Sequence, residues 1–443
     1  MDWSSLIKPY RLGCPKNVFD GGKGRSEFHR DFDRIVFSSA FRRLNGKTQV
    51  VPFPNSDLTH TRLTHSLESA SVARSLGNSV QEKIAELCKS QYDLGALLAA
   101  TCLCHDIGNP PLGHSGESAI QYFFESEEGR KHLNELPATK QADFLHFDGN
   151  AMGFHILTHH NTYKTKNYGG LGLTLPVLAA YCKYPTCTSS FSKESSDVAS
   201  KKPGLFSGDC ETYSEISEGL KINKPNTKEN RWDRHPLAFL AEAADDICNT
   251  IIDYEDGYKS GIISFKSLEK LFSAIANSTY PKINMEGLKK INCDREKAGF
   301  LRSKAINSLT MKTVELFQTH ENEILAGTFK ECLSDYFKQY DSWKRIRKES
   351  KEKLYNRQQV LEKEIAGFEV IPGLLKIFLS ASRDPASSKH EKILKLLPSE
   401  FNKTYKELPY EAIMDITTYV CGMTDGFAVD TYRKLTGMKI PYS

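Results

Sequence analysis

The apolar residues of this chain recur mainly at helical spacing. Between residues 66 and 87 they follow one another at steps of three or four, as on one face of an amphipathic helix. The stretch 93–106 is apolar on nearly every side and predicts a central, buried helix that ends at the glycine and prolines of 108–111. Another helix is expected after Pro236, and strand-like alternation is rare and short. The pattern predicts an all-α protein.

The same pattern suggests three regions along the chain. We expect an N-terminal arm over residues 1–30, a core over 31–260 and a helical C-terminal region over 261–443, which includes one highly charged helix from about 341 to 365. Residues 186–234 are rich in Ser, Lys, Glu, Gly and Asn and contain few large apolar residues. Such a composition buries little surface to offset its ordering entropy, so this segment is predicted to be a mobile insertion or lid.

The charge of the chain is balanced as a whole but uneven along its length. The 443 residues include 59 Lys and Arg against 55 Asp and Glu, a formal net charge of +4, which by itself indicates neither nucleic-acid nor membrane binding. Residues 1–62, however, hold eleven basic and six acidic residues, and residues 236–256 hold six acidic residues and no Lys or Arg. A metal cation suits the acidic segment, and a polyphosphate suits the basic side chains.

The cysteines and the N-terminus suggest a cytosolic protein. Eleven Cys are scattered without a CxxC pair, which is typical of reduced thiols and not of a disulfide framework or a zinc ribbon. The first twenty residues lack the apolar region of a signal peptide. The best apolar run, residues 94–104, is shorter than the roughly 18–20 residues that cross a bilayer. We therefore expect a cytoplasmic chain without a membrane partner.

Side chains that bind metals occur in three separate helical segments. They are His65 in HTRLTHSLESA, the adjacent His105 and Asp106 in CLCHDIGNPPLGHSGE, and Asp245 in AEAADDICNTIIDYEDG. A single inward histidine is usually a hydrogen-bonded core residue, but buried carboxylates are costly unless a cation or a hydrogen bond compensates them. The combination therefore favours a metal site. Two imidazoles and two carboxylates suit Mn²⁺, Mg²⁺, Fe²⁺ or Co²⁺ without choosing among them.

In this order, the four residues resemble the metal signature of the HD-domain phosphohydrolases. Further blocks extend the resemblance to the deoxyguanosine triphosphate triphosphohydrolase (dGTPase) family: RDFDRIVFSSAFRRLNGKTQV, HTRLTHSLESA, HDIGNPPLGHSGE, FDGNAMGF, KYP, EAADDI and CGMTDGFAVDTYRKLTG. They run from about Arg30 to Gly437, nearly the whole chain, and are together far more specific than an HD pair. The resemblance implies an HD-domain helical core with additional C-terminal helices that complete the substrate pocket.

The resemblance also implies an activity. In that family water attacks the α-phosphorus of a deoxynucleoside triphosphate, and the products are the nucleoside and intact triphosphate. One divalent metal per active site, Mn²⁺ or Mg²⁺ with Co²⁺ or Fe²⁺ as alternatives, would be held by His65, His105, Asp106 and Asp245. Asp246 is the neighbouring alternative to Asp245. The eight-residue step from Asp245 to Asp253 favours Asp245, because it matches the family's pairing of a metal-binding Asp with a sugar-contacting Asp.

An acid or base is also needed beside the metal, because the 5′-oxygen leaves poorly as an alkoxide. His114 and Glu117 are three residues apart at the start of the next expected helix, and similar positions in the family form a catalytic pair in which the Glu orients the imidazole. The alternative is that Ser115 or Asn109 caps this helix and Glu117 merely favours its positive N-terminus.

Several further residues resemble the family's substrate contacts. By this resemblance Arg62 and Lys183 would bind phosphate, Asn150 would position the substrate, and Gln49 and Val50 would contact the sugar and base, with Asp253 also at the sugar. Arg42 and Arg43 could bind phosphate too, but we favour a structural or inter-subunit ion pair for them.

Two positions depart from the family pattern and leave the preferred base open. Asn249 stands where relatives often have a Tyr that packs near the sugar. Lys376, in GFEVIPGLLKIF, stands where some relatives have an acidic residue able to recognise guanine, and an ammonium group cannot accept the same hydrogen bonds. Hydrolysis of dGTP is thus expected less firmly than hydrolysis of dNTPs in general.

Two other functions remain alternatives. The metal site could serve an HD-type phosphodiesterase or 5′-nucleotidase, or the chain could be a single-stranded-DNA-binding protein with a regulatory HD site, since residues 343–357 are strongly basic. The resemblance further implies a homo-oligomer, a dimer or a hexamer, and single-stranded DNA as an effector.

Overall fold

The computed structural model describes residues 1–13, 25–49, 60–84, 92–159, 170–192, 197–225, 229–278, 287–288, 290–401, 405–406 and 408–439. Val50 lies outside these residues. Within them the chain forms helices and short helical turns, and its extended pairing is confined to four isolated β-bridges. The prediction of an all-α fold is confirmed.

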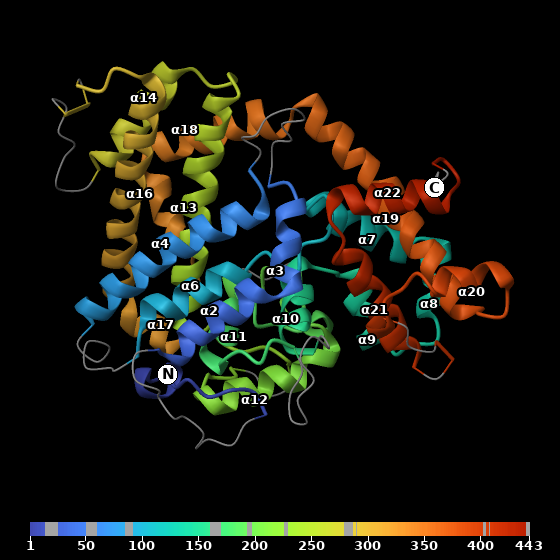
Figure 1. The fold of residues 1–443 in the computed structure, drawn as a ribbon. Coiled ribbons are helices and arrows are strands. Elements are labelled where there is room, and N and C mark those ends of the chain that lie inside the picture. The colour runs from blue at the N-terminus through green and yellow to red at the C-terminus, as the bar shows by residue number, and fades with distance from the viewer. Residues whose placement is uncertain are drawn as a thin grey trace.

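The helices of the described residues follow one another along the whole chain (Figure 1). Their bounds are α1 (Trp3–Leu6), α2 (Glu27–Phe37), α3 (Ser39–Arg43), α4 (Arg62–Lys83), α6 (Leu94–Cys104), α7 (His114–Glu125), α8 (Glu127–Leu133), α9 (Ala138–Leu145), α10 (Gly149–His159), α11 (Leu175–Tyr181), α12 (Cys210–Leu220), α13 (Pro236–Lys259), α14 (Phe265–Ala276), α16 (Asp294–Thr319), α17 (Glu321–Ala326), α18 (Asp341–Ser350), α19 (Gln358–Arg383), α20 (Ser388–Leu394), α21 (Pro409–Cys421) and α22 (Asp425–Leu435).

The centre of the molecule is built around α6. Every residue of this helix is buried, and the side chain of Asp93 caps its first turn by accepting a hydrogen bond from the amide of Ala96. It packs against α2, α4, α11 and α13. The α4 helix approaches unusually closely because Gly77 faces α6, where an added Cβ would lie 2.5 Å from the carbonyl oxygen of Leu94. The predicted central helix therefore forms the core against which the four surrounding helices pack.

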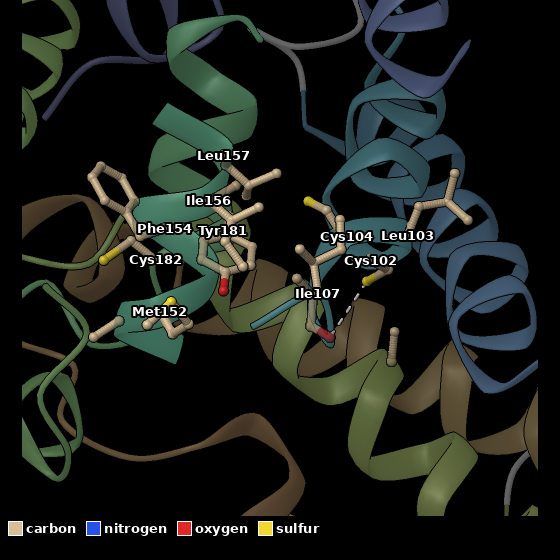
Figure 2. Close-up of a cluster of buried hydrophobic side chains, with 14 of the residues drawn as sticks. Cys102, Leu103, Cys104, Ile107, Met152, Phe154, Ile156, Leu157, Tyr181 and Cys182 are labelled. Atoms are coloured by element: carbon tan, nitrogen blue, oxygen red, sulfur yellow. Dashed lines mark hydrogen bonds between the residues drawn. The ribbon is translucent and has the colours of Figure 1, made fainter. Parts of the chain in front are cut away.

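Apolar side chains fill the space between α6 and the pair α10 and α11. In Figure 2, Cys104 and Ile107 at the end of α6 lie toward Ile156 and Leu157 of α10 and Tyr181 of α11. Burial of such side chains removes apolar surface from water and is the main favourable contribution to folding. This core anchors the C-terminal end of α6, where the predicted HD pair stands.

The C-terminal region forms two groups of helices joined by α19. On one side α14, α16 and α18 pack with α13, and on the other α20, α21 and α22 pack along α19, which also lies against α7 (Figure 1). By length and composition alone α19 could cross a membrane, a test that core helices of soluble proteins also pass, and half of its most apolar window is buried in the protein.

The charged helix expected over residues 341–365 is two helices. α18 ends at Ser350, a short π-helical stretch follows over Lys351–Tyr355, and α19 begins at Gln358. The continuous charge pattern did not reveal this break, because Lys and Glu are compatible with the helix and with its interruption.

The described parts of the segment 186–234 are packed, which its composition did not predict. Its few large apolar residues are nearly all used, since Phe206, Tyr213 and Trp232 are buried and Tyr213 stacks edge-on against Trp232. The expectation of uniformly reduced thiols also fails here, because Cys187 and Cys210 form a disulfide. Composition underestimated how much surface a small number of well-placed aromatic residues can bury.

Candidate functional site

The predicted metal ligands converge from three helices. His65 lies in the first turns of α4, His105 directly follows α6, and Asp245 lies in α13. The Nε2 atom of His65 is 3.1 Å from Oδ1 of Asp245, and the Nε2 atom of His105 is 3.4 Å from the same oxygen. Oδ1 of Asp106 is 3.5 Å from Nε2 of His105. His65, His105 and Asp245 thus form a group that could hold a metal ion.

The environment of His105 fits a metal ligand. Its Nδ1 donates to the carbonyl oxygen of Cys102 at 2.6 Å, so Nε2 is the ring nitrogen directed at the two carboxylates. That Nε2 is buried and has no hydrogen-bond partner among the described residues. Because a buried polar atom without a partner is costly, a divalent cation between His105 and the facing carboxylates would account for it.

The two facing carboxylates are held in the ionised state by nearby cations. Burial opposes ionisation, but Arg62 and the two histidines lower the pKa of Asp106 to about 2. Burial also raises the pKa of Asp245, but Lys183 and His105 outweigh this effect and hold the pKa well below its usual range. Arg62 is 2.9 Å from Asp106, and Nζ of Lys183 is 2.6 Å from Oδ2 of Asp245. The two predicted phosphate ligands therefore stand directly beside the metal-type carboxylates.

Asp245, and not its neighbour Asp246, faces the histidines. Asp246 accepts a hydrogen bond from the hydroxyl of Ser334. Burial and the adjacent Glu242 raise the pKa of Asp246 to about 6. Asp245 also accepts a hydrogen bond from Asn249 at 2.8 Å, and Asn249 in turn accepts one from Gln49 at 3.1 Å. The departure at Asn249 therefore links a predicted sugar or base contact to a predicted metal ligand.

His114 and Glu117 form a hydrogen-bonded pair at the start of α7. Nδ1 of His114 is 2.8 Å from Oε2 of Glu117, while Oε1 of Glu117 accepts a hydrogen bond from the amide of Gly149 at 2.9 Å. The hydrogen bond to Glu117 raises the pKa of His114. The helix is capped by Gly113 without a side-chain hydrogen bond, so the alternative in which Ser115 or Asn109 caps it is wrong.

One cavity of about 1000 Å³ contains all these groups, a volume at the upper end of small-molecule sites. The remaining predicted contacts that the structure describes line it as well. Asn150 donates to Asp148 at 2.7 Å, and Asp253 accepts a hydrogen bond from the hydroxyl of Tyr355 at 2.8 Å. Burial raises the pKa of Asp253 to about 7.

The cavity also contains residues that the sequence did not single out. Its additional basic residues are Lys202, Arg347, Lys348, Lys351 and Lys363. Most of them flank the break between α18 and α19, which turns part of the charged segment toward the cavity. The basic run of residues 343–357 is visible in the sequence, but such a run alone is usually a solvated helix face and does not predict a cavity wall.

Two positions considered from the sequence, Lys376 and Arg43, lie outside this cavity. Lys376 pairs with Glu128 at 2.6 Å on the surface and is not among the residues that line the cavity. The α19 helix lines the cavity through Val360, Lys363 and Glu364 instead. Arg43 lines a separate cavity of about 520 Å³ beside α21 and α22.

Comparison with known proteins agrees with this geometry. Residues 62–180 match the HD domain family model. The chain is 37% identical to a deoxyguanosinetriphosphate triphosphohydrolase-like protein of Pseudomonas aeruginosa over 100% of both chains. It is 36% identical to a protein of the same name in a Synechocystis species, over 99% of this chain and 100% of the relative. It is also 28% identical to a deoxyguanosinetriphosphate triphosphohydrolase of Salmonella schwarzengrund, over 93% of this chain and 94% of the relative. Because the likeness extends over the full length, the chain belongs to the deoxyguanosinetriphosphate triphosphohydrolase family of metal-dependent HD hydrolases.

Proposed function

We propose that this protein hydrolyses deoxynucleoside triphosphates, dGTP first among them, to the deoxynucleoside and inorganic triphosphate by attack of water on the α-phosphorus. The observation that carries the proposal is that one cavity combines the His/Asp cluster, the His114–Glu117 pair and a set of basic side chains. A nucleoside triphosphate needs all three, since its reaction requires an activated water, a proton for the leaving oxygen and cations for the phosphates.

His65, His105, Asp106 and Asp245 would hold one divalent ion, Mn²⁺ or Mg²⁺, with Co²⁺ or Fe²⁺ as alternatives. The ion, when bound, lowers the pKa of a coordinated water and polarises a phosphoryl oxygen. The buried Nε2 of His105 without a hydrogen-bond partner supports this role, as does the ionised state of both carboxylates.

His114 would supply the proton that the 5′-oxygen takes up as it leaves. Its raised pKa favours the protonated imidazole near neutral pH, which is the form a general acid needs. Glu117 would act as a positioning residue, because its carboxylate is fixed by the amide of Gly149 on one oxygen and holds His114 with the other. This arrangement would keep the proton donor at a defined place in the cavity that the metal-type ligands also line.

The basic residues of the cavity would bind the triphosphate. Arg62 and Lys183 lie next to the metal-type carboxylates and would contact the phosphates nearest the reacting phosphorus. Asn150 would help to position the substrate, while Gln49, Val50 and Asp253 would face the deoxyribose and base. The hydrogen bonds from Gln49 to Asn249 and from Tyr355 to Asp253 support this orientation, since they fix two of these polar groups at the cavity wall.

The decisive experiment is to incubate the purified chain with each dNTP and Mn²⁺ or Mg²⁺ and to separate the products by ion-exchange chromatography. Release of nucleoside together with triphosphate is expected, and dGTP should react fastest. Pyrophosphate, inorganic phosphate or a shortened oligonucleotide would instead favour a phosphodiesterase or 5′-nucleotidase. The His105→Ala variant should lose hydrolysis, and His390→Ala, at a partly exposed histidine outside the cavity, serves as its control.

The assembly and the setting of the protein are proposed from the family resemblance. We expect a cytoplasmic homo-oligomer, a dimer or a hexamer, whose activity responds to single-stranded DNA. Light scattering measures the assembly, and hydrolysis assays with and without an oligonucleotide measure the response. If His105→Ala abolished hydrolysis but left DNA binding intact, catalysis and DNA binding would be separable functions of one chain.

A further inference from the structure

A second cluster of metal-type side chains lies outside the catalytic cavity. His155 and His159 are four residues apart on α10, and Asp209 ends the short 3-10 turn Ser207–Asp209 that precedes α12. None of the three lines the cavity described above. The four-residue step places both imidazoles on one face of the helix, and that face is turned toward the Asp209 carboxylate.

The two imidazoles converge on a single carboxylate oxygen. Nδ1 of His155 is 3.1 Å and Nδ1 of His159 is 3.0 Å from Oδ1 of Asp209, and the rings are stacked with an interplanar angle of 4°. Tetrahedral ligation with bonds of roughly 2.0–2.2 Å separates neighbouring ligand atoms by about 3.3–3.6 Å. The distances are thus close to those of a metal site, and they match the 3.1 and 3.4 Å found in the HD cluster.

Charge and exposure also suit a cation. Asp209 supplies a carboxylate whose side chain is only 1% exposed. The side chains of His155 and His159 are 19% and 39% exposed, so an ion and a water molecule can reach the cluster from solvent. The competing explanation is purely structural, with each imidazole donating a hydrogen bond to Asp209. His159 has a further contact of 2.9 Å with the hydroxyl of Thr158.

We propose that His155, His159 and Asp209 form a second metal site that binds a borderline divalent ion of the Zn²⁺ type. Two imidazoles and one carboxylate provide three ligands and leave a fourth position for water, a set that zinc accepts readily. Mg²⁺ is disfavoured because it prefers oxygen ligands. The site would fasten the end of α10 to the start of α12. Since the first residue of α10, Gly149, contacts Glu117, the same helix would connect this site with the catalytic pair.

The test uses the full-length chain, stripped of metal and then dialysed against Zn²⁺, with the bound ions counted by elemental analysis. Wild type is expected to hold two ions per chain, and the His65→Gln/His105→Gln variant should keep one. Adding His155→Gln and His159→Gln to that variant should remove the remaining ion or weaken its binding at least about tenfold. The surface pair His29→Gln/His390→Gln is the matched control and should hold two.

Two further readouts keep the proposal falsifiable. Co²⁺ added to the His65→Gln/His105→Gln variant should give the visible absorption typical of a four-coordinate ion. Zn²⁺ should raise the melting temperature of the same variant. Asp209→Asn, which preserves the shape of the side chain, should abolish both effects even if the double His variant folds poorly. The proposal is overturned if the His65→Gln/His105→Gln variant binds no Zn²⁺, or if His155→Gln/His159→Gln binds as many ions as wild type. Hydrolysis of dNTPs in the presence of Mn²⁺ should persist in the His155→Gln/His159→Gln variant.

Discussion

At the scale of single residues, neighbouring carboxylates in this site have opposite protonation behaviour. Asp245 is surrounded by Lys183 and the histidines, which favour its charge, whereas its neighbour Asp246 is buried near Glu242, which disfavours charge. Adjacent positions on a helix point about 100° apart, so one residue can face the cluster while the next faces the hydroxyl of Ser334. Chemical role is set here by direction and not by residue type.

This contrast predicts different outcomes for the same substitution at the two positions. Asp245→Asn should lower both metal affinity and the rate of hydrolysis by at least about a hundredfold, more than the loss of an outer contact produces. Asp246→Asn should retain most activity, because an amide oxygen can still accept the hydrogen bond from Ser334. Metal titration and steady-state kinetics measure both effects. Equal losses in the two variants would contradict the assignment of Asp245.

The His114–Glu117 pair predicts a pH dependence. If His114 donates its proton, kcat is sustained where the imidazole is protonated and falls as the pH rises through its raised pKa. In Glu117→Gln the carboxylate that raises this pKa is gone, so the decline should begin at lower pH, nearer the ordinary value of about 6.5. The maximal rate should also fall, by about 10²–10⁴-fold. An unchanged alkaline limb in the pH–rate profile would exclude His114 as the acid.

Much of this site could be predicted from sequence, and the limits were physical. The order of His and Asp residues identified the cluster, and the step from Asp245 to Asp253 selected the carboxylate that faces the histidines. The partner of Asp253 could not be predicted, because Tyr355 is brought to it from a helix end about a hundred residues away. Sequence spacing describes neighbours on one helix but not contacts across the fold.

At the scale of elements, the interruption between α18 and α19 shapes the cavity wall. Helical periodicity found α4, α6 and α13 because their apolar positions are regular, but the charged segment of residues 341–365 gave no sign of where it would break. The break allows Arg347, Lys348 and Lys351 to line the cavity together with Lys363 from the following helix. A single straight helix could not bring both of its ends to the same pocket.

Whether α18 contacts the substrate can be tested by comparing two of its basic residues. Arg347 lines the cavity, whereas Lys344, three residues earlier, lies outside it and extends toward Asp341. Loss of a charged hydrogen bond costs about 1.5–3 kcal/mol, so Arg347→Ala should raise the KM for a dNTP about tenfold or more. Lys344→Ala should leave KM nearly unchanged. Similar KM values for the two variants would show that this face does not contact substrate.

At the scale of the whole molecule, Asp425 joins distant parts of the chain around the cavity. One of its oxygens accepts a hydrogen bond from the amide of Leu112, two residues before α7, at 2.9 Å. The other accepts from the amide of Thr48 at 3.1 Å and from Nζ of Lys363 at 2.7 Å. Its pKa is lowered, because Lys363 and these hydrogen bonds outweigh burial. The last helix of the fold therefore fixes three sides of the site.

Asp425→Asn is expected to reduce kcat/KM for dNTP hydrolysis by about ten- to a hundredfold, as for other residues that orient a catalytic group. Asn has a single accepting oxygen, so it can accept from the amide of Leu112 or from that of Thr48 but not from both, and it loses the ion pair with Lys363. Asp430→Asn, on the exposed face of the same helix, is the control, since its carboxylate pairs only with Lys434 and Lys439 among the ion pairs of the described residues. Equal kinetics in the two variants would contradict this role of Asp425.

Asp425 lies in α22, the last helix of the described residues, and this order along the chain has a consequence for biosynthesis. A nascent chain that has emerged as far as α13 already holds His65, His105, Asp106 and Asp245, but it lacks the wall from α18 and α19 and the contacts of Asp425. Since chains are made from the N-terminus onward, the residues of the His/Asp cluster are present well before the cavity can be complete. The His/Asp cluster can therefore begin to form during synthesis, whereas the wall of the cavity is complete only after α18, α19 and α22 have been made.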